Sequence, residues 1–283
     1  MTMRNEPTAR QVRLGTELRR LREAAGMSAK EVAGLIGSSS AHMSQIESGS
    51  SGISEDRLRR LAAHCACGDD GLINALATIA TDRTRGWWEE YRGVLPSPFL
   101  DLSELDHHAT FRRDVAVIHI PGLLQTEPYA RELFSYMAPE LPETELQLMV
   151  NHRMRRRVVI ERPNPIAYEA VIHEAALRIK VGDRTASVKQ LARVLALSEA
   201  EHVTVRVIPF SLNSFAGAGS TMVYVGGPVA RLDTVVRDAP HGNAFIDAPA
   251  QLDHFRTLFR KVEAVSLDPT ESRDFIHRMS KEL

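Results

Sequence analysis

The sequence has 283 residues, with 35 Lys and Arg against 36 Asp and Glu, so its formal net charge is -1. Hydrophobic residues make up 43% of the chain and charged residues 25%, a composition that excludes a largely disordered, collagenous or disulfide-braced protein. At about 100 to 200 residues per domain, the length predicts two domains. The N-terminal segment is charged throughout, and no apolar run approaches the ~20 residues that span a bilayer. We therefore expect a cytoplasmic protein that makes no membrane contact.

Residues 1–82 are predicted to form an all-helical domain of five short helices. Their expected positions are residues 13–26, 28–37, 39–49, 54–68 and 72–79. The second helix starts with Ser28 and Glu31 at the spacing of a capping box, and the third starts with Ser39 as its N-cap. Glycines follow most of these segments, as is typical of helix ends.

The helical pattern breaks at TDRTRGWWEEYRGVLPSPF, which contains both tryptophans, so the domain boundary is expected near residues 81–86. Residues 83–283 then mix helical and strand patterns, which predicts an α+β domain, with α/β as the alternative. The expected helices are 99–112, 126–137, 142–160, 185–199, 250–264 and 269–280. The expected strands are 114–120, 166–172, 203–208, 220–225 and 231–237.

Two of the short helices, joined by a turn at Gly37, have the pattern of a helix-turn-helix, whose second helix can enter the ~12 Å major groove of DNA. Ala33 is small where the two helices approach each other, and Met43 and Ile46 face the core. At about 100° per residue, the opposite face of the second helix is polar and points outward. That face consists of Ala41, Ser44, Gln45 and Ser48, with Ser40 and His42 on its flanks.

The segment LRRLREAAGMSAKEVAGLIGSSSAHMSQIESG resembles the phage-repressor-like helix-turn-helix regulators of the XRE, or Cro/CI, type. The resemblance implies base contacts from Ser40, Ala41 and Gln45, with His42 and Ser44 as additions. Gln45 can bond bidentately to adenine N6 and N7, and Ala41 can touch a thymine methyl group. The resemblance also implies a structural ion pair between Arg22 and Glu47.

Phosphate contacts are expected from the hydroxyl groups and the guanidiniums that flank the third helix. The residues expected to make them are Ser39, Ser48, Arg10, Arg13 and Arg57. The sequence departs from strong members of the family because no Lys or Arg lies between Glu31 and Asp56. Binding by one subunit is then weak, so a homodimer on double-stranded DNA is expected. The alternative is a helical module that docks onto another protein.

The later segments WWEEYRGVLPSPFLDLSELDHHA and HIPGLLQTEPYAREL resemble the C-terminal domain of WhiJ-like, antitoxin-type actinobacterial regulators. In that family a small protein encoded by an adjacent gene is often the partner. The resemblance therefore implies an antitoxin-like repressor that a partner modulates. The most specific segment, Pro121–Arg131, is interpreted either as a structural corner or as a partner surface. A third reading is a small-ligand sensor with a pocket at the loop 210–220.

Two residue clusters in the C-terminal part allow a functional or a structural interpretation. Trp87, Trp88 and Tyr91 are a candidate partner surface, because aromatic side chains dominate interface energies, or else they pack internally. Arg153, Arg155, Arg156 and Arg157 resemble a nucleic-acid patch, or else they form a solvated helix face.

The sequence gives little support for catalysis or for a bound cofactor. It lacks the G-x-S-x-G, H-E-x-x-H and G-x-x-x-x-G-K-[ST] motifs, so we expect no enzyme and no cofactor. Cys65 and Cys67 are its two cysteines, and with His64 and Asp69 they match no structural zinc spacing. We expect no metal site.

Overall fold

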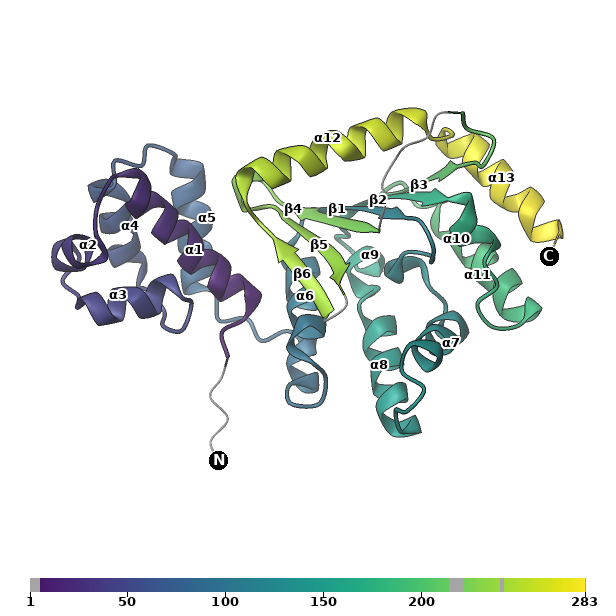
Figure 1. The fold of residues 1–283 in the computed structure, drawn as a ribbon, viewed down its shortest axis with the longest axis horizontal. Helices are drawn as coiled ribbons and strands as arrows, with labels where there is room; N and C mark the ends of the chain where they lie inside the picture. The colour runs from purple at the N-terminus through teal and green to yellow at the C-terminus, as the bar shows by residue number, and fades with distance from the viewer. Residues whose placement is uncertain (1–5, 214–220, 240–241, 283) are drawn as a thin grey trace. The chain divides into compact units, whose positions relative to one another are not determined.

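The computed structural model describes residues 6–213, 221–239 and 242–282 of the chain, which folds into two compact units (Figure 1). Unit 1 consists of Met1–Glu90, Phe99–Leu105 and Val229–Leu232, and unit 2 consists of Tyr91–Pro98, Asp106–Pro228 and Asp233–Leu283. Unit 1 thus extends past residue 82 and takes in two later segments. The helical class expected for the N-terminal part and the α+β class expected for the rest are both confirmed.

The N-terminal part of unit 1, up to residue 82, contains five α-helices whose starting points are set by capping side chains. They are α1 (Ala9–Ala24), α2 (Ala29–Leu35), α3 (Ser40–Glu47), α4 (Glu55–His64) and α5 (Asp70–Thr81). In each helix the residue before the first turn accepts a hydrogen bond from a backbone N–H that would otherwise have no partner. These capping residues are Thr8, Ser28, Ser39, Ser54 and Asp69.

The core of unit 1 is apolar, and it fixes α3 against α1. Leu18, Ile36 and Met43 are fully buried in it. Gly15 of α1 lies so close to α3 that a Cβ atom there would meet the carbonyl oxygens of Ile46 and Glu47 at 2.5 Å. A residue without a side chain is therefore required at position 15 for α1 and α3 to approach this closely.

Unit 2 is built on a six-stranded mixed sheet with the strand order β3-β2-β1-β4-β5-β6. Its strands are β1 (Phe111–Ala116), β2 (Ala167–His173), β3 (Val203–Ile208), β4 (Met222–Gly226), β5 (Thr234–Ala239) and β6 (Gly242–Ile246). The pairs β1–β2 and β2–β3 are parallel, and the other three pairs are antiparallel.

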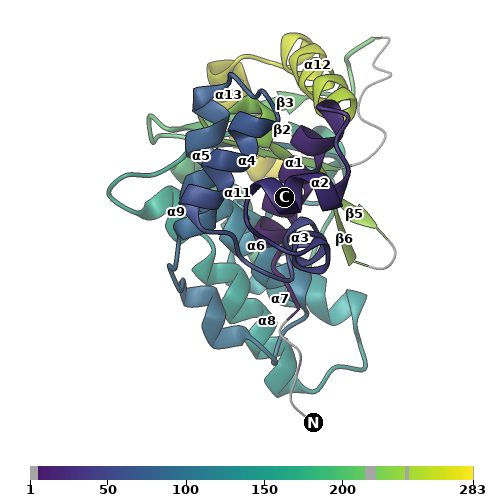
Figure 2. The same ribbon diagram turned by 90° about the vertical axis from the view of Figure 1, so that its left-hand side faces the viewer.

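Helices cover both faces of this sheet, as Figure 1 shows for α12 on one side and α8 and α9 on the other. The helices of unit 2 are α7 (Glu127–Met137), α8 (Glu143–Arg155), α9 (Val158–Glu161), α10 (Glu174–Arg178), α11 (Arg184–Leu197), α12 (Pro249–Val265) and α13 (Pro269–Glu282). Helix α6 (Ser97–His108) is divided between the units, because Phe99–Leu105 belongs to unit 1. Phe255 and Phe259 of α12 pack on Val115, Tyr224 and Val235 of the sheet. Helices α7 and α8 lie side by side in both views (Figures 1 and 2).

Several elements after residue 82 differ from the sequence prediction. Helix α10 was not expected, and the one helix expected at 142–160 is divided into α8 and α9. Helix α6 ends at His108 and β1 begins at Phe111, whereas a helix was expected to run to residue 112 and the strand to begin at 114. The cause is that β1 opens with charged residues, which are buried because they pair with one another. Strand β6 was not expected at all.

Candidate nucleic-acid interface

Helices α2 and α3 form the helix-turn-helix, and local hydrogen bonds define its turn. Ser28 and Glu31 make the expected capping box at the start of α2. Gly37 follows α2 with a φ of 65°, a left-handed conformation that glycine adopts without strain. The hydroxyl of Ser39 then accepts a hydrogen bond from the backbone N–H of His42 at 3.1 Å, which starts α3.

The side of α3 opposite the core is exposed and carries no charge. Met43 and Ile46 are buried, whereas the residues predicted to face outward are exposed. The exposed residues are Ser40, Ala41, Ser44, Gln45 and Ser48. His42 is only half-buried, but its Nε2 atom is shielded from solvent and has no hydrogen-bond partner among the described residues. This atom therefore faces the protein and not a ligand.

Serine hydroxyl groups on α3 are partly committed to the helix backbone. Ser44 Oγ donates to the carbonyl oxygen of Ser40 at 3.1 Å, and Ser48 Oγ donates to that of Gln45 at 3.0 Å. Both hydroxyls keep their lone pairs and can still accept a hydrogen bond. The Gln45 carboxamide has no hydrogen-bond partner within the described parts of the chain, so it is available to both donate and accept.

Arg22 and Glu47, the pair implied by the family resemblance, are bonded to each other. Arg22 Nε lies 2.5 Å from Glu47 Oε1, and Arg22 Nη2 lies 2.9 Å from Glu47 Oε2. The hydrogen bond to Glu47 raises the pKa of Arg22 above its usual value. The side chains are about a tenth exposed, so the pair joins α1 to the end of α3 inside the unit.

The three arginines expected at phosphates differ in how free they are. Arg13 is only 7% exposed and pairs with the buried carboxylate of Glu17 at 3.3 Å, so it does not lie on the outer surface expected of it. Arg10 pairs with Asp82 at 2.7 Å. Burial opposes ionisation of Asp82, but hydrogen bonds from Thr84 and Arg10 hold its pKa well below the usual range.

Arg57 is the exception among the arginines of α1 and α4. Every other arginine in these two helices forms an ion pair with a carboxylate. The remaining pairs are Arg19–Glu23, Arg20–Glu17, Arg59–Glu55 and Arg60–Asp56. Within the described ranges Arg57 has no carboxylate partner, and its Nη2 lies 3.5 Å from the carbonyl oxygen of Gly37 in the turn before α3. Lys30 of α2 is exposed and also lacks an ion-pair partner in the described chain, a feature that the sequence alone did not reveal.

The aromatic partner surface expected at residues 87–91 does not hold for Trp88. Its side chain is 2% exposed and stands edge to face with Trp87, with ring centroids 6.1 Å apart. Tyr91 is half-buried and makes an edge contact with the buried His152 at 5.0 Å. Trp88 therefore packs internally, whereas the partner surface remains a prediction for the half-buried Trp87 and Tyr91.

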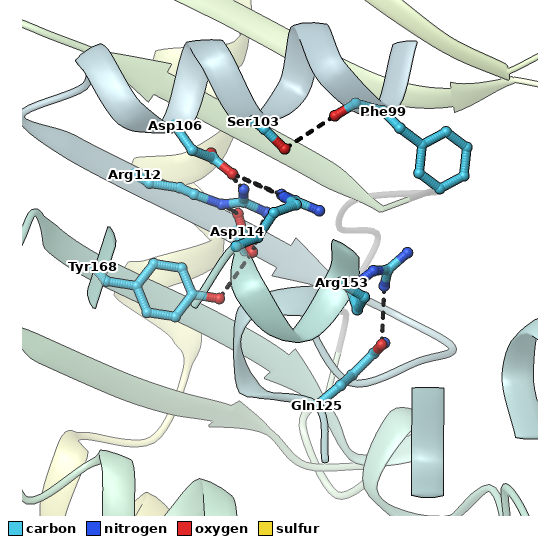
Figure 3. Close-up of polar contacts among 9 residues, drawn as sticks. Phe99, Ser103, Asp106, Arg112, Asp114, Gln125, Arg153 and Tyr168 are labelled. Carbon is cyan, nitrogen blue, oxygen red and sulfur yellow. Dashed lines mark hydrogen bonds and ion pairs between the residues drawn. The ribbon is translucent and has the colours of Figure 1, made fainter. Parts of the chain in front are cut away.

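Unit 2 contains a fully buried network of charged side chains on the α8 side of the sheet (Figure 3). Arg112 donates to both oxygens of Asp114 at 2.8 and 3.0 Å and to Asp106 at 2.7 Å. Arg156 donates to Asp106 at 2.7 Å, and the Tyr168 hydroxyl donates to Asp114 at 2.8 Å. Two positive and two negative charges therefore balance inside the unit.

The pKa values in this network follow from the pairing. Burial opposes ionisation of Asp106, but the Arg112 and Arg156 guanidiniums hold its pKa below the ordinary value. Burial and the neighbouring Asp114 carboxylate raise the pKa of Tyr168 well above its usual range. The Asp106 carboxylate thus stays charged and the Tyr168 hydroxyl keeps its proton, as a structural network requires.

The Pro121–Arg131 segment is held as a corner by internal hydrogen bonds. Gln125 is 2% exposed, donates to the carbonyl oxygen of Ile120 at 2.7 Å and accepts from Arg153 at 2.9 Å (Figure 3). Gln190 donates to the carbonyl oxygen of Leu124 at 2.8 Å. The Gln125 side chain and the Leu124 carbonyl oxygen are thus hydrogen-bonded within the fold, as a structural corner requires.

The cluster of arginines at 153 and 155–157 fits neither a nucleic-acid patch nor a solvated helix face as a whole, because Arg156 is buried.

Three further expectations concern metals, membranes and ligands. In the portion of the chain that the structure describes, no group of three or more His, Cys, Asp or Glu side chains is placed to hold a metal ion. None of the described helices has the length and apolar character needed to cross a membrane. Most of the proposed ligand loop, residues 214–220, lies outside the described residues.

Comparison with known proteins assigns both parts of the chain. A family described as Helix-turn-helix domain matches residues 13–76, which indicates a regulator that binds DNA. A family described as Domain of unknown function (DUF5753) matches residues 99–278, more than half of the chain. No curated protein and no solved structure matches this chain. The chain therefore belongs to the DUF5753 family, with a helix-turn-helix domain preceding the domain that defines the family.

Proposed function

We propose that this protein is a sequence-specific transcriptional regulator that inserts α3 into the major groove of double-stranded DNA. The observation that carries the proposal is the exposed, uncharged face of α3 within a matched helix-turn-helix domain. The cap at Ser39, the Arg22–Glu47 pair and the close approach at Gly15 hold this helix in one orientation. A fixed recognition helix loses little conformational entropy on binding, which favours specific contact.

Base contacts are assigned to the outward side chains of α3, and phosphate contacts to the residues around its ends. The base-contact set is Ser40, Ala41, Ser44 and Gln45, with His42 at its edge through the ring atoms other than Nε2. The phosphate set is Ser39, Ser48 and Arg57, together with Lys30. Arg10 and Arg13 are left out because their guanidiniums already pair with carboxylates.

One helix-turn-helix with so few free cations binds DNA weakly, because phosphate neutralisation supplies most of the nonspecific affinity. We therefore assign a homodimer, with two α3 helices about 34 Å apart on successive turns of the duplex. The DUF5753 region is assigned dimerisation and response to a small partner protein encoded next to this gene. The resulting role is an antitoxin-like repressor of the XRE type in the cytoplasm, acting by occupancy of its operator and not by catalysis.

A footprint on the DNA upstream of this protein's own gene tests the proposal, with and without the adjacent small gene product and at two salt concentrations. A repeated protected site that the partner alters supports an autoregulating repressor. A site altered instead by a small molecule points to a ligand sensor. Absence of any footprint, with equal and weak binding to all duplexes, contradicts sequence-specific DNA binding and favours a protein-docking module.

A further inference from the structure

The outward face of α3 offers hydrogen-bonding and apolar groups but no cation. Gln45 presents a carboxamide with one acceptor and two N–H donors, and none of them is used inside the described chain. The Ser44 hydroxyl donates its hydrogen bond to the Ser40 carbonyl oxygen, so toward a ligand it acts chiefly as an acceptor. Ala41 contributes a methyl group beside them. These three groups form the centre of the face, with the Ser40 hydroxyl and the His42 ring at its edge, and neither edge residue is an Arg or a Lys.

This surface lacks the side chains that usually bind guanine. The commonest specific contact to guanine is an Arg or Lys that binds O6 and N7 together. Helix α3 contains neither residue, and all arginines of α1 and α4 except Arg57 are tied to carboxylates. The two cations without a carboxylate partner in the described chain lie on other helices and are assigned to phosphates. They are Arg57 of α4, beside the Gly37 carbonyl oxygen, and Lys30 of α2.

Adenine and thymine match the groups that remain. A Gln carboxamide pairs with adenine N6 and N7, a serine lone pair can accept from the adenine amino group, and an alanine methyl packs on the thymine methyl. We propose that the face of α3 formed by Ala41, Ser44 and Gln45 selects A·T base pairs and makes no direct contact with guanine. This inference rests on the proposed DNA-binding function and adds the class of sequence that the protein reads.

The test begins with the full-length protein and a random double-stranded DNA library, from which bound duplexes are selected and sequenced. The selected site is then resynthesised with single base analogues. Replacing the contacted adenine by 7-deaza-adenine removes N7 and is expected to weaken binding by up to about 5- to 150-fold, the range of a lost bidentate pair. Replacing each guanine of the half-site by 7-deaza-guanine is expected to leave the affinity unchanged.

A specificity switch gives an independent readout. Gln45→Arg is expected to exchange the preference for A·T at one position of each half-site for G·C, while the other positions stay the same. Ser50→Arg adds the same charge on an exposed residue just beyond α3, and it is expected to raise affinity for all duplexes without changing the preferred sequence.

The outcomes separate this inference from the function on which it rests. A selected duplex whose binding depends on guanine N7 and not on adenine N7 overturns the A·T assignment but leaves DNA binding intact. A selected site unaffected by Gln45→Arg also overturns it. A library from which no duplex is enriched overturns both the inference and the proposed function.

Discussion

Arg22 of α1 connects the recognition helix to the turn that precedes α2. Its Nε and Nη2 atoms bond the Glu47 carboxylate at 2.5 and 2.9 Å, and its Nη1 atom donates to the carbonyl oxygen of Met27 at 2.8 Å. A guanidinium is suited to this role because its planar fork binds a carboxylate at two points and keeps a further donor free. The orientation of α3 therefore depends on a buried residue of another helix.

Glu47→Gln is expected to lower the free energy of unfolding by about 3 kcal/mol, because it removes the carboxylate that binds Arg22 at two points in a poorly solvated site and leaves only Glu23 at 3.5 Å. Urea unfolding followed by far-UV circular dichroism measures this change. The matched control is Glu55→Gln, which removes the exposed carboxylate partner of Arg59 in α4 and should alter stability little. Equal destabilisation by both variants would contradict a structural role for the buried pair.

The close approach of α1 and α3 yields a prediction with an internal control. Gly15→Ala places a Cβ atom 2.5 Å from backbone oxygens of α3, so the helices must separate, and a loss of about 1 to 3 kcal/mol of stability is expected. Gly34→Ala adds a Cβ within α2 where no atom lies within 4 Å, and it should stabilise the protein by about 1 kcal/mol. For Gly15→Ala, the melting temperature and the affinity for DNA should both fall. For Gly34→Ala, the affinity for DNA should be retained.

The helix-turn-helix could be predicted closely because its signals are local. Ser28 with Glu31 and Ser39 before α3 are capping patterns that act within one turn, and they lie where the sequence placed them. Gly15 was not identified, because its importance depends on the approach of a helix about 30 residues later in the chain, which no local pattern encodes.

Long-range pairing accounts for the other differences. Arg10, Arg13 and Arg57 look alike in the sequence. In the structure Arg10 forms an ion pair with Asp82 and Arg13 forms one with Glu17, and only the fold brings these carboxylates close. The charged start of β1 did not suggest a buried strand, because its burial requires Asp106 from the preceding helix. Periodicity describes one element at a time and is silent about such partners.

Asp106→Asn is expected to destabilise the protein strongly, by about 3 to 5 kcal/mol, because it leaves Arg112 and Arg156 buried without the charge that they share. Thermal unfolding of the variant measures the loss. Glu199→Gln removes the carboxylate of an exposed pair with Arg273 and should cost about 1 kcal/mol or less. If Asp106→Asn were as mild as this control, the network would have to be solvated, contrary to its burial.

His152 predicts how stability depends on pH. Burial, reinforced by the nearby Arg156 and Arg153, lowers the pKa of this histidine to about 3, whereas an unfolded histidine titrates near its usual value of 6.5. Between these values the unfolded chain binds a proton that the folded chain rejects, so stability rises with pH by at most about 1.4 kcal/mol per unit. The full contribution is present above pH 6.5 and is lost as the pH falls.

Urea unfolding of the wild type and of His152→Gln isolates this contribution. The measurements cover about three pH units around the ordinary pKa of histidine, from about pH 4.5 to about pH 7.5. The free energy of unfolding at neutral pH also depends on how the new side chain packs. The diagnostic quantity is therefore the slope of the free energy of unfolding against pH below the histidine's usual pKa of 6.5, which should be shallower in His152→Gln. Identical slopes for the two proteins would show that His152 takes up its proton in the folded state.

Arg57 should determine much of the salt dependence of DNA binding. Each phosphate that a cation neutralises contributes about 0.9 to the slope of log affinity against log salt concentration. Arg57→Gln is therefore expected to weaken binding to specific and random duplexes alike and to reduce the slope by about 0.9 for each bound subunit. Arg60→Gln is the matched control, because Arg60 lies on the same helix but pairs with Asp56 at 2.9 Å. Binding titrations at several salt concentrations measure this slope for both variants. A larger reduction of the slope for Arg60→Gln than for Arg57→Gln would mean that the ion pairs of α4 open when DNA binds. The absence of an ion pair would then not identify the phosphate contacts.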